Sequence, residues 1–179
     1  MQKDMIVQFV CFETSLDTEQ FTAEWEQYIQ ANHDNTDTTL QQSEKKSGFR
    51  YISQHRSATG EFQFLFTKGR RSSHNPEVDI KAKQAGGYSI LQLERDHAQP
   101  QEIKIFVFVI DPTSDMGSFR KLSVHGKLNI YEAYYENCQY AYILEYFVKG
   151  KFAPELLEQL KLLNAAEVGS YKECALQAS

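Results

Sequence analysis

Residues 102–110, EIKIFVFVI, form the most strand-like run of the chain. Side chains alternate between the two faces of a strand, and Phe106 and Phe108 share one face of this run. β-Branched residues occupy the other face: Ile103, Ile105, Val107 and Val109. A strand that is apolar on both faces is buried on both faces, so this run predicts a sheet that is covered on two sides.

The residues before this strand predict six elements in the order strand, helix, strand, strand, helix, strand. Asn75 can cap the second helix, Pro76 suits its first position, and Gly86 and Gly87 would end it. Residues 32–47 hold one large apolar residue and predict a solvated loop. The expected elements span residues 5–12, 17–32, 48–56, 61–68, 76–85 and 88–93.

The same order is expected again from residue 102, with similar residues at the junctions between elements. The corresponding junctions lie 81, 78 and 83 residues apart. They are Lys68-Gly69 with Lys149-Gly150, Pro76-Glu77 with Pro154-Glu155, and Gly86-Gly87-Tyr88 with Gly169-Ser170-Tyr171. This correspondence predicts an internal duplication, with a first repeat at 1–97 and a second at 98–179, together forming one compact unit.

The order βαββαβ is that of a ferredoxin-like unit, which leaves one face of its sheet bare. With the aromatic residues Phe21, Trp25 and Tyr28 on the first helix, the chain resembles the dimeric α+β barrel superfamily, including its antibiotic-biosynthesis-monooxygenase and EthD-type members. The resemblance implies an α+β fold in which two fused ferredoxin-like repeats join their antiparallel sheets into one barrel. Two separate ferredoxin-like domains with open sheets are the alternative architecture.

Composition excludes several classes of function. Nineteen Lys and Arg against 24 Asp and Glu give a net charge of -5, which argues against a nucleic-acid surface. No segment approaches the roughly 20 apolar residues of a membrane helix. The three cysteines form no CxxC pair, so we expect reduced thiols and a cytoplasmic protein. Neither metal-ligand spacing nor a nucleotide-binding motif is present, so we expect no metal and no cofactor.

One strand carries the candidate catalytic residues. Tyr51, Ser53 and His55 share a face of the expected strand 48–56 because they are two positions apart. If that face lines the barrel, His55 can act as a general base and Tyr51 can donate a hydrogen bond to a substrate oxygen. The alternative is an exposed histidine near the end of a hairpin, beside Arg56.

Candidate ligand-binding residues are Gln8, Tyr131 and Tyr134. Gln8 is a polar break in a buried strand, and its amide either points into a cavity or lies at a strand edge. Tyr131 and Tyr134 can line the same cavity, although tyrosines also fill β cores without binding a ligand. Residues 68–74, KGRRSSH, lead into the helix expected at Pro76 and form either an anion site or a solvated basic loop.

Two functions remain open on these grounds. The first is the binding of a small aromatic or apolar molecule in a cavity between the repeats, without catalysis. The alternative is a cofactor-independent monooxygenase or isomerase of the dimeric α+β barrel type, which uses His55 and a tyrosine. The expected partner is a small-molecule ligand, with neither nucleic acid nor membrane, and further association into a homodimer stays open.

Overall fold

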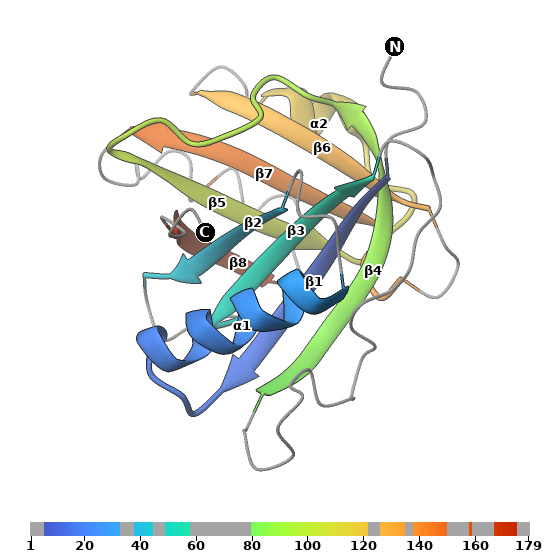
Figure 1. Ribbon diagram of the computed structural model, residues 1–179. Coiled ribbons are helices and arrows are strands. Elements are labelled where there is room, and N and C mark those ends of the chain that lie inside the picture. Colours follow the sequence, from blue (N-terminus) through green and yellow to red (C-terminus); the bar gives the residue numbers. More distant parts are fainter. Residues whose placement is uncertain are drawn as a thin grey trace.

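The computed structural model describes residues 6–32, 38–44, 49–57, 80–121, 126–134, 138–149, 158 and 167–174. Within these ranges, eight antiparallel strands close into a barrel, accompanied by the helices α1 (Thr18–Asn32) and α2 (Met116–Arg120) (Figure 1). The strands are β1 (Ile6–Thr14), β2 (Thr38–Ser43), β3 (Tyr51–Ser57), β4 (Ile80–Gln92), β5 (Glu102–Val109), β6 (Lys127–Ala133), β7 (Tyr142–Lys149) and β8 (Glu167–Glu173).

The barrel consists of two arcs that meet at two seams. The first four strands lie in the order β4-β1-β3-β2, and the last four lie in the corresponding order β8-β5-β7-β6. One seam joins β2 to β8 through three residue pairs, from Gln41 with Glu173 to Ser43 with Tyr171. The other joins β4 to β6. Each described strand of the barrel has a paired neighbour on both sides, although β4 pairs with β6 only from Tyr88 to Gln92. The boundary predicted between residues 97 and 98 falls in the connection from β4 to β5.

The expected α+β fold of two ferredoxin-like βαββαβ repeats is wrong, and the resemblance to the dimeric α+β barrel superfamily is overturned with it. The described chain is a nearly all-β closed barrel with two helices. Residues 80–85, expected in a helix, belong to β4 and pair with β1. The ladder with β1 and the burial of Ile80 outweigh the local helix signals of Asn75 and Pro76. The helix expected from Pro154 lies outside the described residues.

The loop expected at residues 32–47 is also wrong in part, because Thr38–Ser43 forms β2. This strand has one large apolar side chain, Leu40, which is buried beneath α1, and its other face carries Thr39 and Gln41. A strand with a polar inner face lacks the alternation that predicts a strand from sequence.

Three apolar clusters hold the fold together. Phe21 and Trp25 of α1 pack on the outer face of the first arc, and Phe119 of α2 packs on the outer face of the second. Inside the barrel, the ring of Phe9 lies 4.9 Å from that of Tyr131 and 5.6 Å from that of Tyr88, measured between centroids. The interior cluster consists of Val7, Phe9, Cys11, Phe49, Ile52, Tyr88, Phe106, Phe108, Tyr131, Tyr140, Ile143 and Tyr171. Side chains therefore occupy the middle of the lumen.

Neither described helix is both long and apolar enough to span a bilayer.

Candidate functional site

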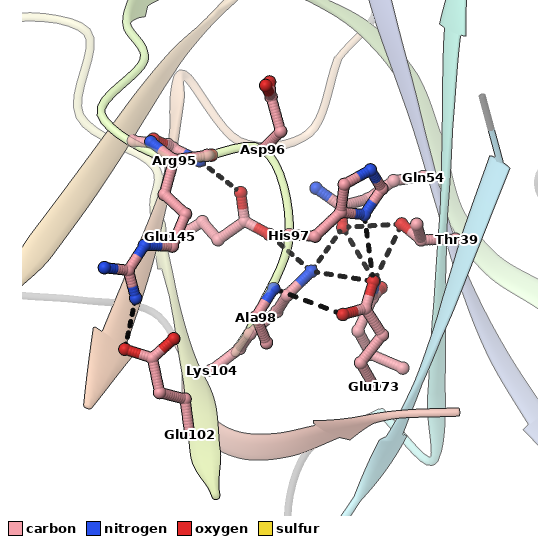
Figure 2. A network of polar contacts seen from close by, with 12 residues as sticks. Thr39, Gln54, Arg95, Asp96, His97, Ala98, Glu102, Lys104, Glu145 and Glu173 are labelled. Carbon is pink, nitrogen blue, oxygen red and sulfur yellow. Dashed lines mark hydrogen bonds and ion pairs between the residues drawn. The ribbon is translucent and has the colours of Figure 1, made fainter. Parts of the chain in front are cut away.

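At one end of the lumen, beneath the β4–β5 connection, the inward-facing side chains are polar instead of aromatic (Figure 2). Lys104 lies on the same face of β5 as Phe106, and Glu145 lies on the same face of β7 as Ile143. Both ionic side chains are 0% exposed. The other buried polar residues of this cluster are Gln41, Gln54 and Asn129.

Lys104 is the centre of the polar cluster. Its Nζ lies 3.0 Å from Glu145 Oε2 and donates to Gln54 Oε1 at 3.3 Å. It also lies 5.5 Å from the centre of the Phe147 ring and 3.8 Å from Glu173 Oε1. A buried ammonium needs this compensation, because the loss of its hydration is costly unless it is paired and hydrogen-bonded.

Glu145 is held in its charged form by its neighbours. Burial by itself would raise the pKa of Glu145, but the charge of Lys104 and hydrogen bonds from Asn129 and Tyr131 hold that pKa below its ordinary value. Asn129 Nδ2 and the Tyr131 hydroxyl donate to Glu145 Oε1 at 2.8 and 2.7 Å. Burial and the charge of Glu145 raise the pKa of Tyr131 well above its usual range, so Tyr131 acts as a neutral donor.

Asn129 fixes the covering loop to the barrel. Its side-chain oxygen accepts from the backbone N–H groups of Glu94 and Arg95 at 2.8 and 3.1 Å, and its Nδ2 donates to Arg95 O at 2.6 Å. Arg95 in turn pairs with Glu102 at the start of β5. One buried amide thus positions the loop over the charged pair.

A tight turn ends this loop. The backbone N–H of Glu102 donates to Gln99 O at 3.0 Å, and Gln101 has a φ of 71°, as the third residue of a type II turn requires. Pro100 occupies the second position, where its fixed φ is favourable. The turn forms one wall of a surface pocket.

The pocket has a volume of about 410 Å³ and lies between residues 97–102 and residues 172–174. Glu173 connects it to the buried cluster, and its side chain is 21% exposed. Glu173 Oε2 accepts from the backbone N–H of Ala98 at 3.2 Å, and Oε1 lies 3.4 Å from His97 Nδ1 and 3.8 Å from Lys104 Nζ. Figure 2 shows these groups converging from the loop, β5 and β8. The arrangement offers a partly exposed carboxylate backed by a buried cation.

The structure places the predicted catalytic residues beneath α1, on the outer face of β3. His55 is 1% exposed, and its Nε2 lies 2.6 Å from Ser53 Oγ, which accepts from Trp25 Nε1 at 3.2 Å. Tyr51 donates to Thr18 Oγ1 at 3.1 Å and also stacks on the α1 side chain Phe21. Tyr51 and His55 therefore share a face, as expected, but that face anchors the helix.

The predicted ligand-binding residues are separated. Gln8 is buried on β1, between β3 and β4, and it shares the outer face with Val10 and Phe12. Tyr131 points into the lumen and joins the polar cluster through Glu145. Tyr134 is 59% exposed. Tyr131 alone among the three belongs to the site described above.

Two other sequence interpretations concern charged groups. The basic segment 68–74 lies outside the described residues. Within the described ranges, no group of three or more His, Cys, Asp or Glu side chains is placed to hold a metal ion.

The sequence contains a signal for the two buried charges of the polar cluster. Lys104 interrupts the apolar face of β5, and Glu145 interrupts the apolar face of β7. A charged residue inside an otherwise apolar strand face is rare unless it is paired. Lys104 and Glu145 are stronger polar breaks than Gln8, because burying a charge costs more free energy than burying an amide.

The sequence matches no known protein-family model, and no curated protein matches it significantly.

Proposed function

We propose that the protein binds a small polar molecule in the pocket between residues 97–102 and 172–174. The observation that carries this proposal is the position of Glu173, which lines the pocket and also approaches the buried ammonium of Lys104. A volume of about 410 Å³ lies within the range of small-molecule sites.

The free-energy cost of burying two charged side chains favours a functional role for the polar cluster. Desolvating Lys104 and Glu145 costs free energy that a well-packed apolar pair at the same positions would not. The cluster lies next to a pocket, and charged groups with shifted pKa values concentrate at functional sites. A recognition role at the pocket explains the retention of both charges better than a contribution to stability does.

The position of the pocket favours a polar ligand over the aromatic or apolar molecule expected from the sequence. The middle of the lumen is occupied by rings in mutual contact, such as Phe9 and Tyr131, whereas the carboxylate residues Glu102 and Glu173 are among those that line the pocket. The oxygenase or isomerase alternative has no comparable support, because its base, His55, is buried beneath α1.

A binding screen on the isotope-labelled protein tests the proposal. The panel consists of small amines, amino acids, carboxylic acids, sugars and nucleosides, each followed by amide chemical shifts. We expect at least one compound to shift the resonances of residues 97–102 and 172–174. Glu173→Gln should weaken its binding by about tenfold or more, since a charged hydrogen bond contributes about 1.5–3 kcal/mol.

The matched control is Glu19→Gln, which makes the same chemical change at an exposed position of α1. It should leave binding unchanged. Ligands that shift residues elsewhere, or that bind Glu173→Gln as tightly as the unmodified protein, would contradict the proposal.

A further inference from the structure

Glu173 is the carboxylate of this site whose charge is least compensated. The buried ammonium of Lys104 lies 3.0 Å from Glu145 but 3.8 Å from Glu173. The guanidinium of Arg95 pairs with Glu102, the other carboxylate that lines the pocket. Among the described residues, Lys104 and His97 are the only cationic or ionisable nitrogen groups within 4.0 Å of Glu173.

The contacts of Glu173 are long for a charged group. Charge-assisted N–H···O bonds are usually about 2.7–2.9 Å, whereas His97 Nδ1 is at 3.4 Å and the Ala98 N–H donor is at 3.2 Å. A carboxylate has about four lone-pair sites, so these contacts leave acceptor capacity on both oxygens. That capacity lies at the pocket wall, where the side chain is 21% exposed.

The charge of the pocket wall selects among ligand groups. An anionic group placed against Glu173 would be repelled by its carboxylate. A protonated amine is compact, carries three donors and would supply the cation that Lys104 supplies only at a distance. Partial burial strengthens such a pair relative to one in bulk water.

We infer that the ligand carries a protonated primary amine and that Glu173 binds this group. The inference rests on the function proposed above, because it assigns a chemical class to the ligand of the same pocket. Lys172 also lines the pocket and is exposed, but it lies on the opposite face of β8 from Glu173.

Four probes with the same four-carbon chain test the inference: butylamine, 4-aminobutyrate, butyrate and 1-butanol. Each is titrated into the isotope-labelled protein, and the amide shifts of Ala98, Gln99 and Lys172–Cys174 are recorded. We expect butylamine and 4-aminobutyrate to produce saturable shifts, with butyrate and 1-butanol producing none at the same concentration. Glu173→Gln should weaken amine binding by about tenfold or more, and Glu19→Gln should not change it.

The outcomes separate this inference from the proposed function. If butyrate or another non-amine compound of the larger panel shifts the pocket residues and no amine does, the inference is wrong and the proposed function stands. If no compound of either set shifts them, both are wrong. The comparison of amines with butyrate uses the unmodified protein, so it remains decisive if Glu173→Gln does not fold.

Discussion

The ammonium of Lys104 on β5 lies 3.0 Å from Oε2 of Glu145 on β7, and neither side chain is exposed to solvent. The two residues are not opposite each other in the ladder, because Lys104 pairs with Phe147 and Glu145 pairs with Phe106. The contact is therefore diagonal, at a separation that long side chains can bridge. Each charge depends on the other for compensation inside the barrel.

Removing one member of this pair should be much more damaging than removing an exposed charge. Lys104→Met leaves Glu145 buried without its cation, and we expect the free energy of unfolding to fall by about 3–5 kcal/mol. Denaturation in urea measures the change. Lys127→Met, at an exposed position of β6, is the control and should change stability by less than about 0.5 kcal/mol.

The double variant Lys104→Met/Glu145→Leu separates charge from packing. If the uncompensated charge causes the loss, the double variant should be more stable than Lys104→Met alone, because apolar replacements of buried ion pairs are often tolerated. Equal stability of the single and double variants would show that the pair does not act through charge.

The lowered pKa of Glu145 predicts a specific loss of stability in acid. A carboxyl group whose pKa is lower in the folded state stabilises the fold above its unfolded pKa, here about 4.5, and this contribution disappears as the pH falls through the folded pKa. Glu145→Gln should therefore be less stable than the unmodified protein near neutral pH, and the difference should shrink below a pH of about 4.5. Urea denaturation across this pH range measures both curves, and a constant difference would contradict the assignment.

The sequence predicts the strands that are rich in apolar residues. It misses the strands that form only because they pair with a distant segment of the chain. The predicted buried strands are confirmed as β1 and β5. They could be predicted because residues 6–12 and 102–109 are dense in β-branched and aromatic residues. β2 carries Gln41 and Thr39 on its inner face because it lines the polar end of the barrel, so its sequence has the composition of a loop. The first part of β4 becomes a strand by pairing with β1, which local helix signals cannot reveal.

The candidate site is also only partly predictable from the sequence. The sequence indicates Tyr131 as a candidate, but its partner Glu145 comes from β7 and the cation Lys104 from β5. Spacing along the chain cannot show that these residues meet, because closure of the barrel brings them together. A polar break in an apolar face indicates that a partner exists without identifying it.

His55 provides a test of the structural role that the fold assigns to it. His55→Ala removes the 2.6 Å contact with Ser53 beneath α1, and the loss of this buried hydrogen bond should lower the free energy of unfolding by about 1–3 kcal/mol. The fluorescence of Trp25, the single tryptophan, should change as well, because its indole nitrogen donates to Ser53. His97→Ala, whose side chain is 54% exposed, is the control and should have a small effect on stability. Unchanged stability and fluorescence in His55→Ala would contradict this role.

Buried tyrosines should make the fold sensitive to alkali. Burial and, to a smaller extent, the charge of Glu94 raise the pKa of Tyr146 to about 12. Burial and the charge of Glu145 raise the pKa of Tyr131 well above its usual range. The fold holds these phenols in the neutral form, so their contribution to stability is complete below the unfolded pKa of about 10 and is lost as the pH rises above it. Tyrosinate absorbance and circular dichroism, recorded on the same samples, should show that the last tyrosines ionise together with unfolding. Tyr131→Phe should lose less stability on going from neutral to alkaline pH than the unmodified protein. Ionisation of all ten tyrosines with the barrel still folded would show that these side chains are not enclosed as described.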